Sequence, residues 1–101
     1  MDIDGYSNGG TSVGEDKKTQ YKMVRYATSY LPKDKVRYLM GVGDPIDIVE
    51  NVCNGIDIFD CVSPTRLARH GHALTRFGKI NIKNAKYKED FTPIEDACTC
   101  Y

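Results

Sequence analysis

The chain has 101 residues, of which 41% are hydrophobic and 28% charged, so it can form at most one small globular domain with a modest core. No apolar run is long enough for a transmembrane helix and Met1 is not followed by a signal peptide, so we expect a cytoplasmic protein without membrane contact. Fourteen basic and fourteen acidic residues cancel, yet seven of the basic ones fall between Cys61 and Lys88, where there is no Asp or Glu. This segregation predicts a polyanionic partner, with a merely solvated basic face as the alternative.

The first fifteen residues indicate a short strand, a glycine-rich turn and a helix start. Residues 2–10 are expected to form the tail of a short strand that runs into a glycine-rich turn, in which Gly9 and Gly10 let backbone approach a ligand or simply form the turn. Ser12 and Glu15 have the spacing of a capping box. The spacing of apolar residues predicts a helix from there to about residue 31, with a buried stripe of Tyr21, Val24, Thr28 and Leu31.

A second strand and a second helix follow. Residues 36–42 have the apolar content of a buried strand, and Asp44-Pro45 combines an N-cap residue with proline at the first helical position. The helix should end at Asn54-Gly55. Its expected apolar face consists of Ile48, Val49, Val52 and Cys53.

The third predicted strand, residues 56–62, carries the candidate catalytic group. Alternation of strands and helices indicates an α/β fold with parallel strands, either a small open sheet or a piece of a β/α barrel. Both folds bind ligands at the carboxyl ends of the strands, so Gly9-Gly10, Met40-Gly41 and Asp60 should meet at one edge. Asp60 is therefore a candidate catalytic carboxylate, although capping of the following turn is the simpler interpretation.

After Pro64 the pattern changes. Residues 72–76 and 79–83 alternate polar and apolar side chains about Phe77-Gly78, which predicts a basic antiparallel hairpin. His70 and His72 could form a metal pair but more often contact solvent or RNA. Residues 87–97 are expected to form an extended connector.

A series of short blocks extends across almost the whole chain: Gly5-Tyr6, Gly9-Gly10, Ser12–Glu15, Leu31-Pro32, Arg37–Gly43, Gly55–Val62, Pro64–Arg66, Asn81-Ile82, Asn84-Ala85 and Cys98-x-Cys100. In their order and spacing these blocks resemble the bacterial-type tRNA-guanine transglycosylases, also called queuine tRNA-ribosyltransferases. The resemblance implies that residues 1–66 form roughly the last three βα units of a TIM-type β/α barrel. Residues 67–101 would then form the basic β-hairpin and the start of a zinc-binding region.

The resemblance also implies a reaction, which exchanges guanine for a 7-deazaguanine at the wobble position of tRNA in queuosine biosynthesis. Asp60 matches the nucleophile that forms a covalent ribosyl-enzyme intermediate, and Val13 favours 7-aminomethyl-7-deazaguanine over queuine. The implied base-binding residues are Gly9, Gly10, Ser12, Val13, Glu15 and Met40. The implied RNA-binding residues are Gly41, Val42, Gly43, Asp44, Pro45, Ile46, Asp47, Thr65, Arg66, Leu67, Ala68 and Arg69.

Several parts of the family's machinery are not in these residues. Cys98 and Cys100 match two zinc ligands, but the third Cys and the His of the structural zinc site are missing, as are the earlier strands with a second Asp as general acid/base. We therefore expect a pentosyltransferase fragment that is inactive alone, with tRNA and a 7-deazaguanine as partners, and a homodimer at full length. Alternatives are a non-catalytic RNA-binding module and an inactive truncated gene product.

Overall fold

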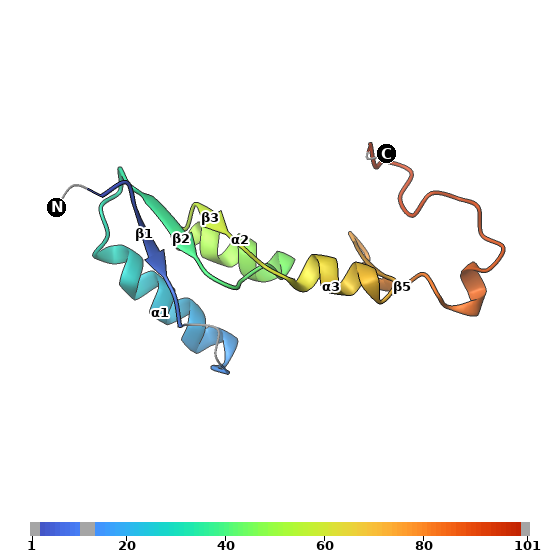
Figure 1. Cartoon of the computed structure of the whole chain (residues 1–101), viewed down its shortest axis with the longest axis horizontal. Coiled ribbons are helices and arrows are strands. Elements are labelled where there is room, and N and C mark those ends of the chain that lie inside the picture. Colours follow the sequence, from blue (N-terminus) through green and yellow to red (C-terminus); the bar gives the residue numbers. More distant parts are fainter. Residues whose placement is uncertain (1–2, 11–13, 100–101) are drawn as a thin grey trace. The chain divides into compact units, whose positions relative to one another are not determined.

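The computed structural model describes residues 3–10 and 14–99 and divides the chain into two compact units, residues 1–63 and 64–101. The first unit contains β1 (Gly5–Asn8), α1 (Lys17–Ser29), β2 (Val36–Leu39), α2 (Pro45–Cys53) and β3 (Ile58–Phe59) (Figure 1). The strands form a parallel sheet in the order β1-β2-β3. This alternation is the predicted α/β pattern, in a small mixed domain.

The core of the first unit lies between the sheet and its helices. Right-handed crossovers between successive parallel strands place α1 and α2 on the same face. Val24 of α1 and Leu39 of β2 are both 0% exposed, and Phe59 of β3 packs against the cluster. Val42 and Ile56, in the loops that leave β2 and enter β3, complete it. The predicted stripe of α1 is confirmed, because Val24 and Thr28 are buried and Tyr21 and Leu31 are half-buried.

Within the first unit, neither α1 nor α2 covers the opposite face of the sheet. Side chains alternate along a strand, so Val36, Tyr38 and Ile58 point away from the face that carries Leu39 and Phe59. Val36 is 44% exposed and Ile58 is 51% exposed. Asp60 continues this alternation beyond β3 and lies on the same side as Tyr38.

The second unit contains α3 (Ser63–Arg69), whose first residue belongs to the first unit, and an antiparallel hairpin of β4 (His72–Thr75) and β5 (Gly78–Asn81). A single 3₁₀ turn, η1 (Ala85–Tyr87), follows. The predicted hairpin is confirmed, but Gly78 is the first residue of β5 and pairs with Thr75, so the turn itself is Arg76-Phe77. The helix α3 was not expected, although a proline in the first turn is a helix-start signal.

Several local boundaries differ from the prediction. The first strand lies at Gly5–Asn8, within the residues 2–10 that were predicted to hold the end of a strand and a turn, because its pairing with β2 outweighs the weak strand preference of Gly and Asn. The second and third strands are shorter than predicted. The cap of α1 is Asp16, whose carboxylate accepts from the Thr19 backbone N–H at 3.1 Å, and Ser12 lies outside the described residues.

The start and end of α2 were predicted correctly, but its buried face was not. Asp44 caps the helix, with its side chain accepting from the Ile46 N–H, and Asn54 ends it, followed by Gly55 at φ +90°. The expected apolar face is largely exposed: Val49 is 64% and Val52 54% exposed, and Cys53 is exposed as well. The residues that α2 buries are instead polar, namely Asp47 and Asn51.

Candidate active site

The carboxyl ends of the three strands lie level with one another. In the parallel register Asn8 pairs with Leu39, and Leu39 pairs with Phe59, so the next residues along the three strands are Gly9, Met40 and Asp60. A further hydrogen bond from the Met40 N–H to the Asn8 carbonyl, at 3.1 Å, holds two of these ends together. The ends of the three strands therefore converge at one edge of the sheet, as expected.

Asp60 is held at this edge by two hydrogen bonds from β2 and the turn that follows it. The Tyr38 hydroxyl donates to Asp60 Oδ1 at 2.6 Å, and the Gly41 backbone N–H donates to the same oxygen at 2.8 Å. Neither bond uses Oδ2. The side chain is exposed at the surface of the unit. One carboxylate oxygen is thus fixed in place, and the arrangement leaves the carboxylate accessible from solvent.

These contacts favour the ionised carboxylate. The Tyr38 hydroxyl, and after it the Gly41 N–H, lower the pKa of Asp60 below its usual value, because both hydrogen bonds stabilise the charged form. The same contact raises the pKa of Tyr38, since the phenol donates its proton to a carboxylate. At neutral pH Asp60 is therefore an anion and Tyr38 a neutral donor.

Two positions in the turn that supplies the Gly41 N–H require glycine. Gly41 has φ +76°, in the left-handed region where side chains are strained. Gly43 lies so close to Cys61 that a Cβ there would collide with the Cys61 Cβ and come within 2.8 Å of Sγ. The turn after β2 can therefore pack against the residue that follows Asp60 only because Gly43 has no side chain.

The remaining predicted base-binding residues lie at or near the same edge where they are described. Gly9, Gly10 and Glu15 are exposed, and Met40 is 50% exposed. Ser12 and Val13 lie outside the described residues. Nothing in the geometry tests the binding roles of these residues, which stay predictions.

The two predicted RNA-binding segments belong to different units. Residues 41–47 run from the turn after β2 into the first turn of α2, and residues 65–69 lie in α3. Within the first segment, the Asp44 carboxylate caps α2 and Asp47 is 5% exposed. The exposed residues of this segment are Gly41, Asp44, Pro45 and Ile46.

The predicted zinc ligands do not complete a site in the described part of the chain. Cys98 is exposed, and Cys100 lies outside the described residues. Within residues 3–10 and 14–99, no group of three or more His, Cys, Asp or Glu side chains could hold a metal ion. Because a structural zinc needs four ligands, the residues present do not fit a complete zinc site.

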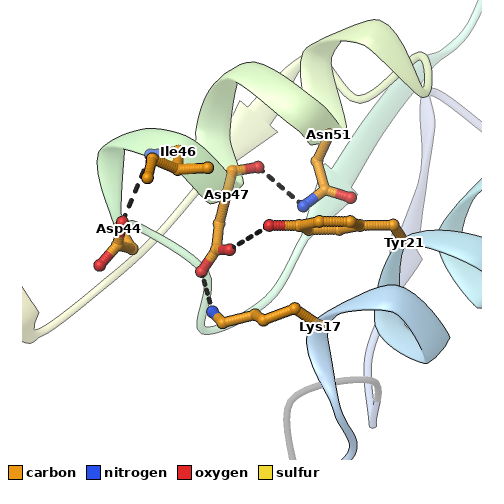
Figure 2. Close-up of polar contacts among 6 residues, drawn as sticks. All are labelled: Lys17, Tyr21, Asp44, Ile46, Asp47 and Asn51. Carbon is orange, nitrogen blue, oxygen red and sulfur yellow. Dashed lines mark hydrogen bonds and ion pairs between the residues drawn. The ribbon is translucent and has the colours of Figure 1, made fainter.

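Sequence reasoning missed the polar residues that support this edge. Tyr38 was overlooked because its importance depends on the register between β2 and β3. Its position two residues before Met40, on the face opposite Leu39, was the available signal. Asp47 was expected to interact with the helix dipole and, by resemblance, with RNA, yet Figure 2 shows Lys17 and Tyr21 reaching from α1 to its carboxylate. An acidic residue in the first turn of a helix gave no hint of such a partner.

The described helices include none that is both long and apolar enough to cross a membrane.

A sequence model of the family described as queuine tRNA-ribosyltransferase matches residues 1–101. The chain is 57% identical to the queuine tRNA-ribosyltransferase of Dictyoglomus turgidum and 54% identical to that of Thermoanaerobacter pseudethanolicus, each over 101 residues. The protein of that name from Lactococcus lactis is 52% identical over the same length.

All of this chain is covered in these comparisons, but only 26–27% of each relative is. The chain thus spans about a quarter of the length of the relatives that it matches. The match nevertheless extends over every residue, including the edge that holds Asp60. The chain belongs to the queuine tRNA-ribosyltransferase family.

Proposed function

We propose that this chain supplies the nucleophile and part of the base pocket of a tRNA-guanine transglycosylase. The reaction would replace guanine at the wobble position of tRNA by a 7-deazaguanine. The observation that carries the proposal is Asp60, an ionised and exposed carboxylate, held by Tyr38 and Gly41 at the carboxyl end of β3. Family membership supports a transferase that acts on tRNA.

In the proposed first step Asp60 attacks the anomeric carbon of the ribose. Its free oxygen forms a bond to C1′ while the bond from C1′ to the guanine nitrogen breaks, and the bonding electron pair leaves with guanine, which takes up a proton. By resemblance, that proton comes from an acid on a strand outside these residues. The ribosyl-aspartate ester is then attacked by the incoming base, which loses a proton, and the Asp60 carboxylate is released.

The hydrogen bonds at Oδ1 suit both steps. They hold the carboxylate in one orientation, so attack requires little reorganisation. They also stabilise the carboxylate as a leaving group when the second base arrives. A carboxylate with a lowered pKa is a weaker nucleophile but a better leaving group, and a double displacement needs both properties.

The base pocket would lie beside Asp60 at the same edge of the sheet. The Gly10 backbone would hydrogen-bond the base and Met40, half-exposed and next to Gly41, would cover its face. Ser12, Val13 and Glu15 would form the wall that selects 7-aminomethyl-7-deazaguanine.

Further strands would be needed for the complete fold. The face of the sheet that carries Val36 and Ile58 is exposed, and β1 and β3 each have only one neighbouring strand in the described part of the chain. A β/α barrel would cover this face with its other strands and pair both sheet edges. The whole enzyme would be a homodimer with a structural zinc, for which Cys98 and Cys100 provide two of four ligands.

A non-catalytic RNA-binding module is the second candidate function. It is favoured by Arg66 and Arg69 on α3 and by the lysines of the hairpin region, which are not balanced by acidic residues between Cys61 and Lys88. Binding through phosphates would weaken steeply with salt and survive Asp60→Asn.

A graft tests the transglycosylase proposal. Residues 1–101 replace the matching segment of the Thermoanaerobacter pseudethanolicus relative, and exchange of labelled guanine in tRNA is measured. We expect activity in the graft, a loss of about 1,000-fold or more in the Asp60→Asn graft, and none in the 101-residue chain alone.

The competing outcomes are distinct. An Asp60→Asn graft with full activity would overturn the proposed nucleophile. If the unchanged graft folds but exchanges no base, while residues 1–101 bind tRNA in a salt-dependent manner, the RNA-binding module is the better interpretation. A graft that neither binds nor reacts would indicate an inactive gene product.

A further inference from the structure

The buried carboxylate of Asp47 joins the first turns of the two helices. Asp47 is the third residue of α2, and its side chain is 7% exposed. The Tyr21 hydroxyl of α1 donates to Asp47 Oδ1 at 2.6 Å, and the Lys17 ammonium pairs with Oδ2 (Figure 2). The Asp47 backbone carbonyl in turn accepts from Asn51 Nδ2 at 2.8 Å. We call Lys17, Tyr21 and Asp47 the rim clamp.

The rim clamp is an unusual use of a buried position. Beside it, α2 exposes Ile46 and Val49, 70% and 64% accessible, while it buries a carboxylate. The Lys17 side chain is 62% exposed, so only the Asp47 carboxylate loses most of its hydration, and the Tyr21 hydroxyl and the Lys17 ammonium compensate for that loss. Because hydrogen bonds are directional, a carboxylate of α2 that is held by two donors from α1 favours one relative position of the two helices.

The clamp lies next to the loops that form the candidate active site. Lys17 is the first residue of α1 and follows the segment with Gly10 and Glu15. Asp47 follows the turn with Met40 and Gly41, which donates to Asp60. The two helices therefore carry, directly before their clamped first turns, the base-pocket loop and the turn that holds the nucleophile.

We propose that the rim clamp is a positioning device that sets the spacing between the described residues of the base-pocket loop, 9–10 and 14–16, and the nucleophile turn, residues 40–44. This inference rests on the proposed function. The clamp residues touch neither base nor ribose and act through the loops. Release of the clamp should leave the chemistry of Asp60 intact and loosen the site in which the incoming base must be held.

The other end of the same helix pair provides a matched control. Thr28, near the end of α1, is buried, and its hydroxyl donates to the carbonyl of Asn54, the C-cap of α2, at 2.7 Å. Tyr21→Phe and Thr28→Val each remove one hydroxyl that links α1 to α2. Only Tyr21 lies near the loops of the candidate active site. A comparison of the two variants therefore separates an effect on positioning from an effect on stability.

Both variants are compared in the graft. For Tyr21→Phe we expect KM for the incoming base to rise about 5-fold, the equivalent of one hydrogen bond, with kcat changed less than 2-fold. Asp47→Asn, which keeps an acceptor for Tyr21 but loses the charge that pairs with Lys17, should raise KM less than Asp47→Ala. Thr28→Val should lower the melting temperature as much as Tyr21→Phe does and leave KM unchanged. Equal KM values for Tyr21→Phe and Thr28→Val would overturn the proposal.

Amide hydrogen exchange in the 101-residue chain gives a readout that is independent of activity. We expect Tyr21→Phe to accelerate exchange at Gly14, Glu15 and Gly41 about 5-fold relative to Thr28→Val. Identical exchange in the two variants contradicts the clamp whether or not the graft is active. An inactive graft with the expected exchange pattern would instead refute the proposed function and leave the clamp standing.

Discussion

The two ends of the parallel sheet are held together in different ways. At the amino end, the Arg37 guanidinium donates to the carbonyls of Leu31 and Pro32, each at 2.9 Å, and of Gly55 at 3.2 Å, which ties the loops after α1 and α2 to β2. At the carboxyl end, Tyr38 and the Gly41 N–H converge on Asp60. The same strand, β2, supplies a side-chain donor at both ends, Arg37 at one and Tyr38 at the other.

The two ends differ in the role of their charged side chain. Arg37 donates to backbone carbonyls near two helix ends, where donors within the helix are missing, and these contacts all lie within the first unit. Asp60 is an acceptor held by two donors on one of its oxygens, and it remains exposed. The amino end therefore serves stability, whereas the carboxyl end presents a charged group to a ligand. Substitutions should affect folding at one end and chemistry at the other.

Arg37→Ala should have the largest effect on folding. It leaves three carbonyls without their donor, and we expect a loss of about 3 kcal/mol in the free energy of unfolding, measured by urea denaturation. Arg25→Ala, at an exposed arginine of α1, is the control and should cost well under 1 kcal/mol. Similar losses in the two variants would show that the guanidinium does not join the loops.

Gly41→Ala should affect the carboxyl end with a smaller effect on stability. The added Cβ meets open space, but φ +76° is unfavourable for alanine and we expect a cost of about 1–2 kcal/mol. Relief of that strain would turn the N–H away from Asp60 and lower base exchange in the graft about 10-fold. Gly78→Ala, with φ +113° and equally open surroundings in the hairpin, should cost similar stability. If the Gly41→Ala graft exchanges base as fast as the unchanged graft, the Gly41 N–H does not support Asp60.

Tyr38→Phe should change the titration of Asp60 and little else. The pKa of Asp60 is lowered in the fold, so its ionised form adds stability above the unfolded pKa, and this stability is lost as pH falls through the folded pKa. Removal of the hydroxyl should raise the pKa of Asp60 toward its ordinary value. The acid limb of base exchange would then move to higher pH, and stability would depend less on pH in the acid range.

The carboxyl ¹³C resonance of Asp60 reports this shift directly. Tyr30→Phe serves as the control, because the Tyr30 hydroxyl contacts the Tyr26 hydroxyl and not a carboxylate. A pKa of Asp60 that is the same in Tyr38→Phe and Tyr30→Phe would contradict the proposed support.

What could be predicted from the sequence was the chemistry of short segments. Asp44-Pro45 begins α2 and Asn54-Gly55 ends it because these residues satisfy or avoid backbone groups within a few positions. The position of Asp60 at a strand end could be predicted for the same reason, since Gly55 and Pro64 bracket the strand. Its role came from the resemblance, not from the pattern.

What could not be predicted depends on partners far along the chain. The buried face of α2 was misassigned because Val49 and Val52 look like core residues, whereas Asp47 becomes buried only when Tyr21 and Lys17 reach it across 26 and 30 residues. An exposed apolar surface on α2 and on the open face of the sheet agrees with a chain that matches a quarter of its relatives' length.

The covalent intermediate tests the central claim most directly. The graft is incubated with wobble-guanine tRNA in the absence of a competing base, denatured and digested, and the peptides are analysed by mass spectrometry. We predict a ribosyl-linked RNA adduct on the peptide that contains Asp60, which disappears in Asp60→Asn and persists at reduced yield in Tyr38→Phe. An adduct on any other residue, or base exchange by the Asp60→Asn graft, would contradict the account.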